Sequence, residues 1–154
     1  MIDTLRIAVS IVRSLRLGGA VAMFCACSAD VPSAAICVAT LDVTCSPAYE
    51  PTYSAIYNNL LSKSCGTPST GNVCHYGQGA RAGLDFSDAQ RSYAALLGTD
   101  GSPIRVMAGD PECSLLVQRI ESADPSFRMP VGREQLSLGE RCAVRKWILD
   151  GAKP

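Results

Sequence analysis

Eight cysteines among 154 residues are the feature that most restricts how this chain can fold. Exported proteins use cysteines at this density as disulfide staples, whereas cytosolic chains keep so many mainly for metal or redox chemistry. The only histidine of the chain, His75, directly follows Cys74, and eight residues separate Cys74 from Cys65. The role of the cysteines therefore depends on whether the chain is exported and on the stretch SCGTPSTGNVCHY at residues 64–76.

The first segment predicts export. Residues 1–16 carry three arginines, and residues 17–26 form a short, uncharged and mostly apolar run that ends in front of Cys27. This order is typical of a secretory signal, and the run is shorter than the roughly 20 residues that a membrane span needs. We expect residues 1–27 to be a signal peptide. Lipoprotein processing would acylate Cys27, and plain cleavage nearby is the alternative.

The remaining cysteines favour disulfides. In residues 28–51, which we interpret as a tether with a small lobe, Cys37 and Cys45 bracket a short β-prone run, so a local Cys37–Cys45 disulfide is expected. Cys113 and Cys142 fall on the apolar faces of two expected helices. A Cys113–Cys142 disulfide would staple these helices and stabilise the fold by about 2–4 kcal/mol.

Residues 52–154 predict an all-α domain of about four short helices joined by long loops. Apolar residues recur at helical spacing, and N-cap residues precede each run. We expect helices over residues 52–64 and 87–98, from Pro111 onwards, and from Ser137 to Gly151, with Thr52, Ser87, Asp110 and Ser137 as N-caps. Long loops in a compact domain need something to fill the space they enclose, and a large flat ligand would do so.

Two cysteines ahead of a histidine are the sequence sign of a covalently attached haem, but two residues usually separate the cysteines. Residues 66–73 make the spacing eight here. Their glycine, proline, serine and threonine content cannot continue a helix and suits a surface loop. Taken alone, the segment therefore also fits a disulfide loop closed by Cys65 and Cys74.

The order of motifs along residues 52–152 resembles the c-type cytochrome domain of exported bacterial proteins and small lipoproteins. The pieces, in order, are an amphipathic helix, the CH pair, AGLDF (82–86), YAALLG (93–98), RVMAGDPECSLLVQRI (105–120), RMP (128–130) and LSLGERCAVRKWILDGA (136–152). The resemblance implies a cytochrome c-like fold around one haem c and assigns residues 52–154 to that domain.

The resemblance also implies the ligands of the haem. Cys65 and Cys74 would form thioether bonds to the haem vinyl groups, His75 would be the proximal axial ligand of the iron, and Met129 would be the distal one. Trp147 would pack near the first helix or the haem edge. An imidazole and a thioether together raise the reduction potential of the iron and suit one-electron transfer.

The eight-residue spacing leaves three outcomes open. Haem attaches through both cysteines, or it attaches or docks through Cys74 and His75 alone, or no haem binds and Cys65 forms a disulfide with Cys74. Met107 is the rival sulfur ligand to Met129, but it lies in an apolar run and is expected in the core.

The expected function is an exported electron carrier in the bacterial periplasm or outer membrane, and not an enzyme. The alternative is a haem-free domain of the same fold, stapled by disulfides, that serves as an envelope lipoprotein or interaction module. Lysine and arginine balance aspartate and glutamate at 14 each, and there is no basic stripe that would suggest nucleic acid. A membrane would be contacted only through a lipid anchor at Cys27, and the redox partner is a protein that the sequence does not identify.

Overall fold

A computed structural model of the chain describes residues 37–38, 40–66 and 74–154. The expected signal peptide, Cys27 and most of the loop 66–73 lie outside the described residues. The described part contains four α-helices, short 3₁₀ and π-helical turns, long loops and no β-strand, apart from an isolated bridge between Met107 and Asp110. The all-α class is therefore confirmed.

The first helix ends at the first cysteine of the motif. The α-helix α1 covers Tyr53–Ile56 and continues directly into a π-helical segment, η1, at Tyr57–Cys65. As expected, Thr52 is the N-cap, because its side chain accepts a hydrogen bond from the Ala55 N–H. The backbone is therefore helical without interruption from Tyr53 to Cys65.

The other helices are α2 at Ala89–Leu97, α3 at Leu115–Glu121 and α4 at Leu138–Leu149. Gly98 ends α2 in the left-handed conformation, with φ of 71°, which glycine adopts at little cost. Ser137 and Glu140 form the expected capping box at the start of α4. The predicted end of α2 at Gly98 and the predicted start of α4 at Ser137 are therefore confirmed.

Two predicted N-caps are wrong. Asp88 caps α2 by accepting from the Arg91 N–H at 2.8 Å, whereas the Ser87 hydroxyl donates to Asp85 at 2.9 Å. Asp110 accepts from the Cys113 N–H at 3.0 Å and so closes a turn ahead of α3 rather than starting it. Neighbouring side chains of similar capping ability compete for each position, and the tertiary structure selects one of them.

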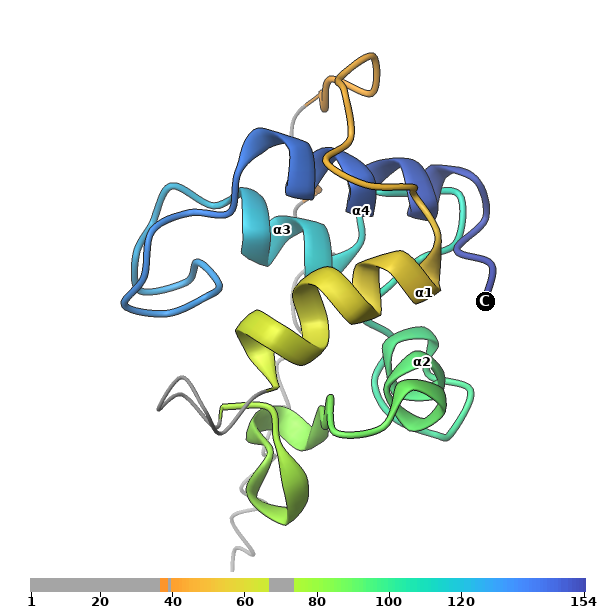
Figure 1. Cartoon of the computed structure of the whole chain (residues 1–154), viewed down its shortest axis with the longest axis vertical. Coiled ribbons are helices and arrows are strands. Elements are labelled where there is room, and N and C mark those ends of the chain that lie inside the picture. The colour runs from red at the N-terminus through yellow and green to blue at the C-terminus, as the bar shows by residue number, and fades with distance from the viewer. Residues whose placement is uncertain (1–36, 39, 67–73) are drawn as a thin grey trace, which may run out of the picture. The chain divides into compact units, whose positions relative to one another are not determined.

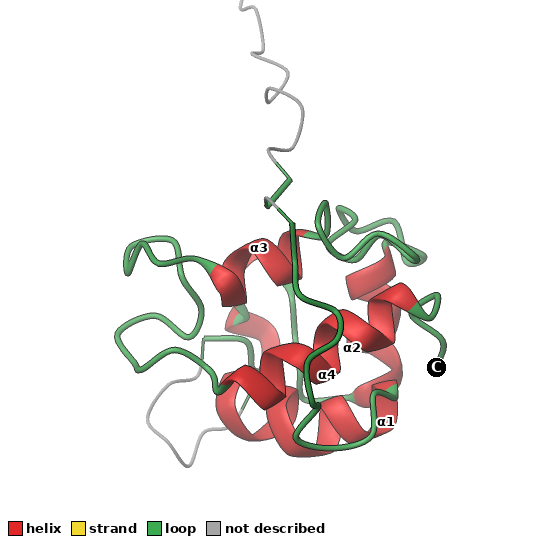
Figure 2. Ribbon diagram, turned by 90° about the horizontal axis from the view of Figure 1, so that it is seen from above, coloured by secondary structure: helices red, strands yellow, loops and turns green. Residues whose placement is uncertain are grey.

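Aromatic rings join three helices in the core. The Tyr53 ring lies 4.8 Å from the Tyr93 ring on α2 and 5.6 Å from the Trp147 ring on α4, measured between centroids. The Tyr53 hydroxyl also donates to the Ala89 carbonyl at 2.7 Å. Trp147 thus packs on the first helix, and α4 lies against both α1 and α3 (Figures 1 and 2).

Both predicted disulfide pairings are wrong. The structure forms Cys37–Cys113, across 76 residues, and Cys45–Cys142, across 97 residues. Neither the local Cys37–Cys45 bridge nor the Cys113–Cys142 bridge exists. Cys113 lies in the turn ahead of α3 rather than on the helix, and Cys142 is fully buried on α4.

The path of the segment ahead of α1 explains the observed pairing. This segment crosses α4 rather than folding on itself (Figures 1 and 2). The Ala48 N–H donates to the Gly139 carbonyl at 2.9 Å, and Arg145 Nη1 donates to the Asp42 carbonyl at 2.9 Å. The expected small lobe is therefore a strap across the C-terminal helix, and its cysteines meet the cysteines of the helical domain.

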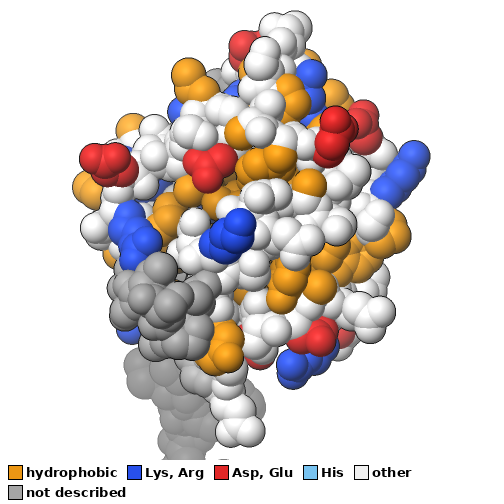
Figure 3. Space-filling view, in the orientation of Figure 1, with side chains coloured by type: hydrophobic (Ala, Val, Ile, Leu, Met, Phe, Trp, Pro, Cys, Tyr) orange, Lys and Arg blue, Asp and Glu red, His pale blue; other side chains and the backbone are white. Residues whose placement is uncertain are grey.

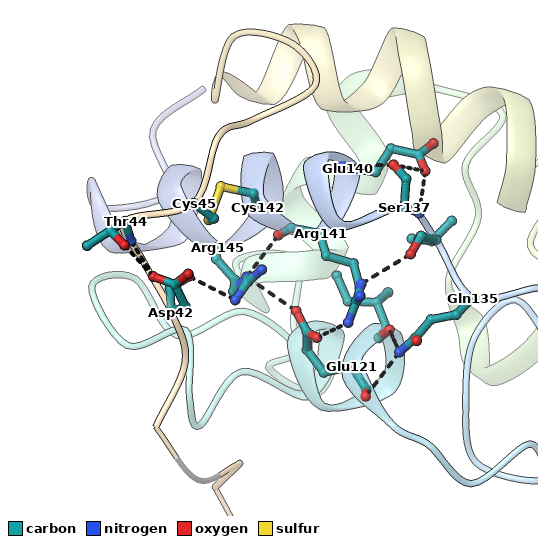
Figure 4. Close-up of polar contacts among 12 residues, drawn as sticks. Asp42, Thr44, Cys45, Glu121, Gln135, Ser137, Glu140, Arg141, Cys142 and Arg145 are labelled. Atoms are coloured by element: carbon teal, nitrogen blue, oxygen red, sulfur yellow. Dashed lines mark hydrogen bonds and ion pairs between the residues drawn. A yellow bond between two sulfur atoms is a disulfide. The ribbon is translucent and has the colours of Figure 1, made fainter.

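A buried acidic side chain links α3 to α4 (Figure 4). Glu121 at the end of α3 pairs with the Arg141 guanidinium and lies 3.3 Å from Arg145 Nε. Each of the three side chains is 12% exposed or less. Because the pairs are shielded from water, removing one partner would leave a charge without compensation.

The face of the molecule in Figure 3 carries no dominant charge. Figure 3 shows acidic and basic side chains scattered over one face, with hydrophobic side chains between them. Among the described residues, no helix has the length and apolar character needed to cross a membrane.

We predict that digestion of the unreduced protein yields peptides that link Cys37 to Cys113 and Cys45 to Cys142. The double variant Cys45→Ala/Cys142→Ala should lose about 2–5 kcal/mol of unfolding free energy, because it releases a long closed loop. Urea unfolding followed by circular dichroism measures this loss. A peptide with a Cys37–Cys45 disulfide would contradict the path of this segment across α4.

Candidate functional site

All four residues that the sequence proposes to hold a haem line one pocket. Cys65, Cys74, His75 and Met129 lie in the wall of a cavity of about 140 Å³. The rest of the wall is mostly apolar and includes Leu60, Leu61, Leu84, Phe86, Leu96 and Ile120. Residues 64 positions apart thus face a single, mostly apolar space.

A backbone hydrogen bond joins the first cysteine of the motif to the histidine. The His75 N–H donates to the Cys65 carbonyl at 3.3 Å, although His75 follows ten positions later. In an α-helix, an N–H bonds to the carbonyl four residues earlier, which is the separation of the first cysteine and the histidine in the usual haem motif. The same two backbone groups are therefore paired here despite the longer spacing.

Gly66 permits this close approach. A Cβ atom added at Gly66 would lie 2.5 Å from the Phe86 Cβ and 3.2 Å from the His75 carbonyl oxygen. The Phe86 N–H also donates to that same carbonyl at 2.8 Å. Only glycine at position 66 leaves room for the backbone of residues 65–66 to lie against residues 75 and 86.

The imidazole of His75 is oriented by a second backbone contact. Its Nδ1 lies 3.1 Å from the Leu84 carbonyl oxygen, and its ring packs edge-on against Phe86 with centroids 5.4 Å apart. A carbonyl accepts only from a protonated nitrogen, so this contact places the proton on Nδ1 and the lone pair on Nε2. Burial lowers the pKa of His75, which favours the neutral ring that binds metals.

Cys65 and Cys74 are thiols in the structure, so the conditional Cys65–Cys74 disulfide is not formed. Burial raises the pKa of the Cys65 thiol to about 12, and the neighbouring Cys74 adds to this rise. Among the described residues, His, Cys, Asp and Glu side chains form no group of three or more that could hold a metal ion. The pocket offers an imidazole and a thioether, the pair that ligates the iron in cytochromes c, and two thiols, the groups to which a haem c is attached.

Met129 reaches the pocket from the loop that follows α3. Its N–H donates to the Arg119 carbonyl at 2.9 Å, which ties the loop to that helix. Met107, the rival sulfur, is 45% exposed and is not part of the pocket wall. The prediction that Met107 lies in the core is wrong, because its apolar run ends in a surface turn.

Sequence reasoning missed two arginines in the pocket wall. Arg105 is only 7% exposed, and the Arg119 guanidinium lies 3.9 Å from the centre of the Phe127 ring. The signal for Arg105 was one charged residue inside the apolar run Ile104–Met107. The signal for Arg119 was weaker, since helices often carry an exposed arginine near their C-terminal end.

Comparison with known proteins supports the assignment in part. The model of the Planctomycete cytochrome C family matches residues 73–130, a stretch that contains Cys74, His75 and Met129 but not Cys65. No curated protein and no solved structure matches the chain. Together with the all-α fold, the family match supports a cytochrome c-like domain.

We predict that Gly66→Ala destabilises the fold by about 1–3 kcal/mol, as overpacking a close contact does. The added methyl group collides with Phe86 and separates Cys65 from His75. Urea unfolding measures the effect, with Asn58→Ala as the control, on the exposed side of the helical segment that ends just before Gly66. Equal stability of the two variants would contradict the close approach at Gly66.

Proposed function

We propose that this chain is an exported c-type cytochrome-like protein that carries one haem and transfers single electrons in the cell envelope. The observation that carries the proposal is the pocket shared by Cys65, Cys74, His75 and Met129. The family match over residues 73–130 supports the same reading.

The two thiols would hold the cofactor covalently. Each thiol would add its sulfur to one carbon of a haem vinyl group and its hydrogen to the other, so that no oxidant would be consumed. The hydrogen bond between the His75 N–H and the Cys65 carbonyl supports attachment through both cysteines, because it holds the first cysteine beside the histidine. We therefore favour double attachment over attachment through Cys74 alone.

His75 and Met129 would be the axial ligands. The contact of His75 Nδ1 with the Leu84 carbonyl keeps Nε2 free of its proton and fixes the plane of the ring. The bond from the Met129 N–H to α3 anchors the loop that presents the thioether. When bound, a haem with this pair of ligands supplies an iron that gains and loses one electron.

The apolar wall would set the reduction potential further. Leu60, Leu61 and Leu96 are at most 1% exposed and exclude water from the space they enclose. A poorly hydrated site disfavours the more highly charged oxidised iron and so raises the reduction potential.

An electron carrier fits the site better than an enzyme does. If His75 and Met129 both bind the iron, the chain itself would supply both of these ligands, which would favour electron transfer over binding of a substrate. The haem-free alternative needs a third disulfide between Cys65 and Cys74, and the structure has thiols there. The partner is a redox protein of the periplasm or outer membrane, where residues 1–27 would direct the chain.

The proposal is tested by producing the full chain in cells that contain the haem-attachment machinery. We expect a coloured protein with a Soret band and a c-type pyridine haemochrome spectrum. A colourless protein that is folded by circular dichroism would refute the proposed function.

Met129→Ala should lower the reduction potential and open a coordination position that binds added imidazole. The reason is that loss of the thioether removes the ligand that favours reduced iron. The matched control is Met107→Ala, which removes an exposed methionine outside the pocket and should leave the spectrum unchanged. An unchanged spectrum and potential in Met129→Ala would reject Met129 as a ligand.

A further inference from the structure

The loop that carries Met129 is fastened to α3 through a single residue, Arg119. The Arg119 Nη1 donates to the Phe127 carbonyl at 3.0 Å, and the Arg119 carbonyl accepts from the Met129 N–H at 2.9 Å. The guanidinium also lies over the Phe127 ring, with its central carbon 3.9 Å from the ring centroid. One residue of the helix therefore holds both the methionine and the residue two positions before it.

The loop presents Phe127 at the end of a closed turn. The Asp124 carbonyl accepts from the Phe127 N–H at 3.1 Å and from the Arg128 N–H at 2.7 Å. The Asp124 carboxylate accepts from the Ser126 N–H at 2.8 Å, a side-chain to backbone bond that is typical of tight turns. Because the turn is closed on itself, a contact that holds Phe127 also restrains Met129.

The return of the loop to the helices has a separate fastening. Gln135 Nε2 donates to the Ile120 carbonyl at 3.3 Å and to the Glu121 carbonyl at 3.2 Å. These bonds lie six residues after Met129. The contacts of Arg119 lie at the methionine itself and just before it, so they restrain the thioether more directly.

The stack on Phe127 orients the Arg119 side chain. The three ion pairs found in the described part of the chain do not include Arg119. Arg119 and Phe127 are both half-buried, and a cation over an aromatic ring is held more strongly where water is partly excluded. The aromatic ring and the carbonyl of the same residue thus fix the guanidinium together.

We propose that Arg119 is a positioning residue and that its side chain forms a latch with Phe127, which keeps the Met129 loop closed over the pocket. This inference rests on the proposed function, in which the Met129 thioether is the distal ligand of the iron. A ligand from solution could take that position only in molecules whose loop is open. Its apparent affinity therefore scales with the open fraction, and the latch keeps that fraction small.

The test measures the affinity of imidazole for the oxidised, haem-loaded full chain by visible absorbance. We expect Phe127→Leu and Arg119→Gln each to bind imidazole about 3- to 10-fold more tightly, because each variant loses the stack. The double variant should resemble Arg119→Gln alone, because both substitutions remove one shared contact. If the two single effects multiply in the double variant, the two side chains do not act as one latch and the proposal is overturned.

Arg145→Gln is the matched control. Arg145 is also a buried arginine that fastens two parts of the fold, but it pairs with Glu121 on α3 and is not part of the pocket wall. Its loss should lower the stability in urea unfolding and leave the affinity for imidazole unchanged. A native affinity in Phe127→Leu, or an equal gain in Arg145→Gln, would overturn the latch.

A second measurement needs no haem. In the full chain before haem is loaded, hydrogen exchange of the Met129 N–H is followed by NMR. Local opening of the loop controls this exchange, so it should be faster in Arg119→Gln and Phe127→Leu than in the native chain and in Arg145→Gln. Equal rates in the native chain and in Phe127→Leu would overturn the latch. A native chain that takes up no haem would instead refute the proposed function, and the exchange rates would still decide the role of Arg119.

Discussion

The hydrogen bond between the His75 N–H and the Cys65 carbonyl is the contact on which the candidate site depends. It returns the chain to the end of the first helix after an unusually long spacing, and so sets the two ends of the motif side by side. Gly66 makes the contact sterically allowed, and the Phe86 N–H secures the other side of His75. The imidazole, both thiols and the apolar wall are thereby arranged around one pocket.

Contacts elsewhere in the fold hold this arrangement in place. The strap ahead of α1 is fastened across α4 by the Cys45–Cys142 disulfide, and Glu121 joins α3 to α4. Since Met129 is bonded to the Arg119 carbonyl on α3, the helix that anchors the methionine loop is itself held in place. Disulfides and buried ion pairs thus take over part of the role of a large core in a domain with long loops.

Features that depend on local sequence, such as the helices, could be predicted from the sequence. Features that depend on the tertiary path of the chain, such as the disulfide pairing, could not. Helical spacing and the Ser137–Glu140 capping box predicted the helices, and the adjacency of Cys74 and His75 pointed to the site. The predicted disulfide pairings were wrong, because proximity along the chain does not reveal that residues 40–52 cross α4. Arg105 was missed because a single charged residue gives no sign of whether its side chain points into a pocket.

We propose that both cysteines hold one haem across the eight-residue spacing. Trypsin should release residues 64–81 as one peptide, since Lys63 and Arg81 flank a stretch without lysine or arginine. Mass spectrometry of this peptide from the haem-loaded, alkylated protein tests the claim most directly. We predict the mass of the peptide plus one haem and no alkyl group. One haem with one alkyl group on Cys65 would show that Cys65 is not attached, and two alkyl groups without haem would show that neither cysteine holds a haem.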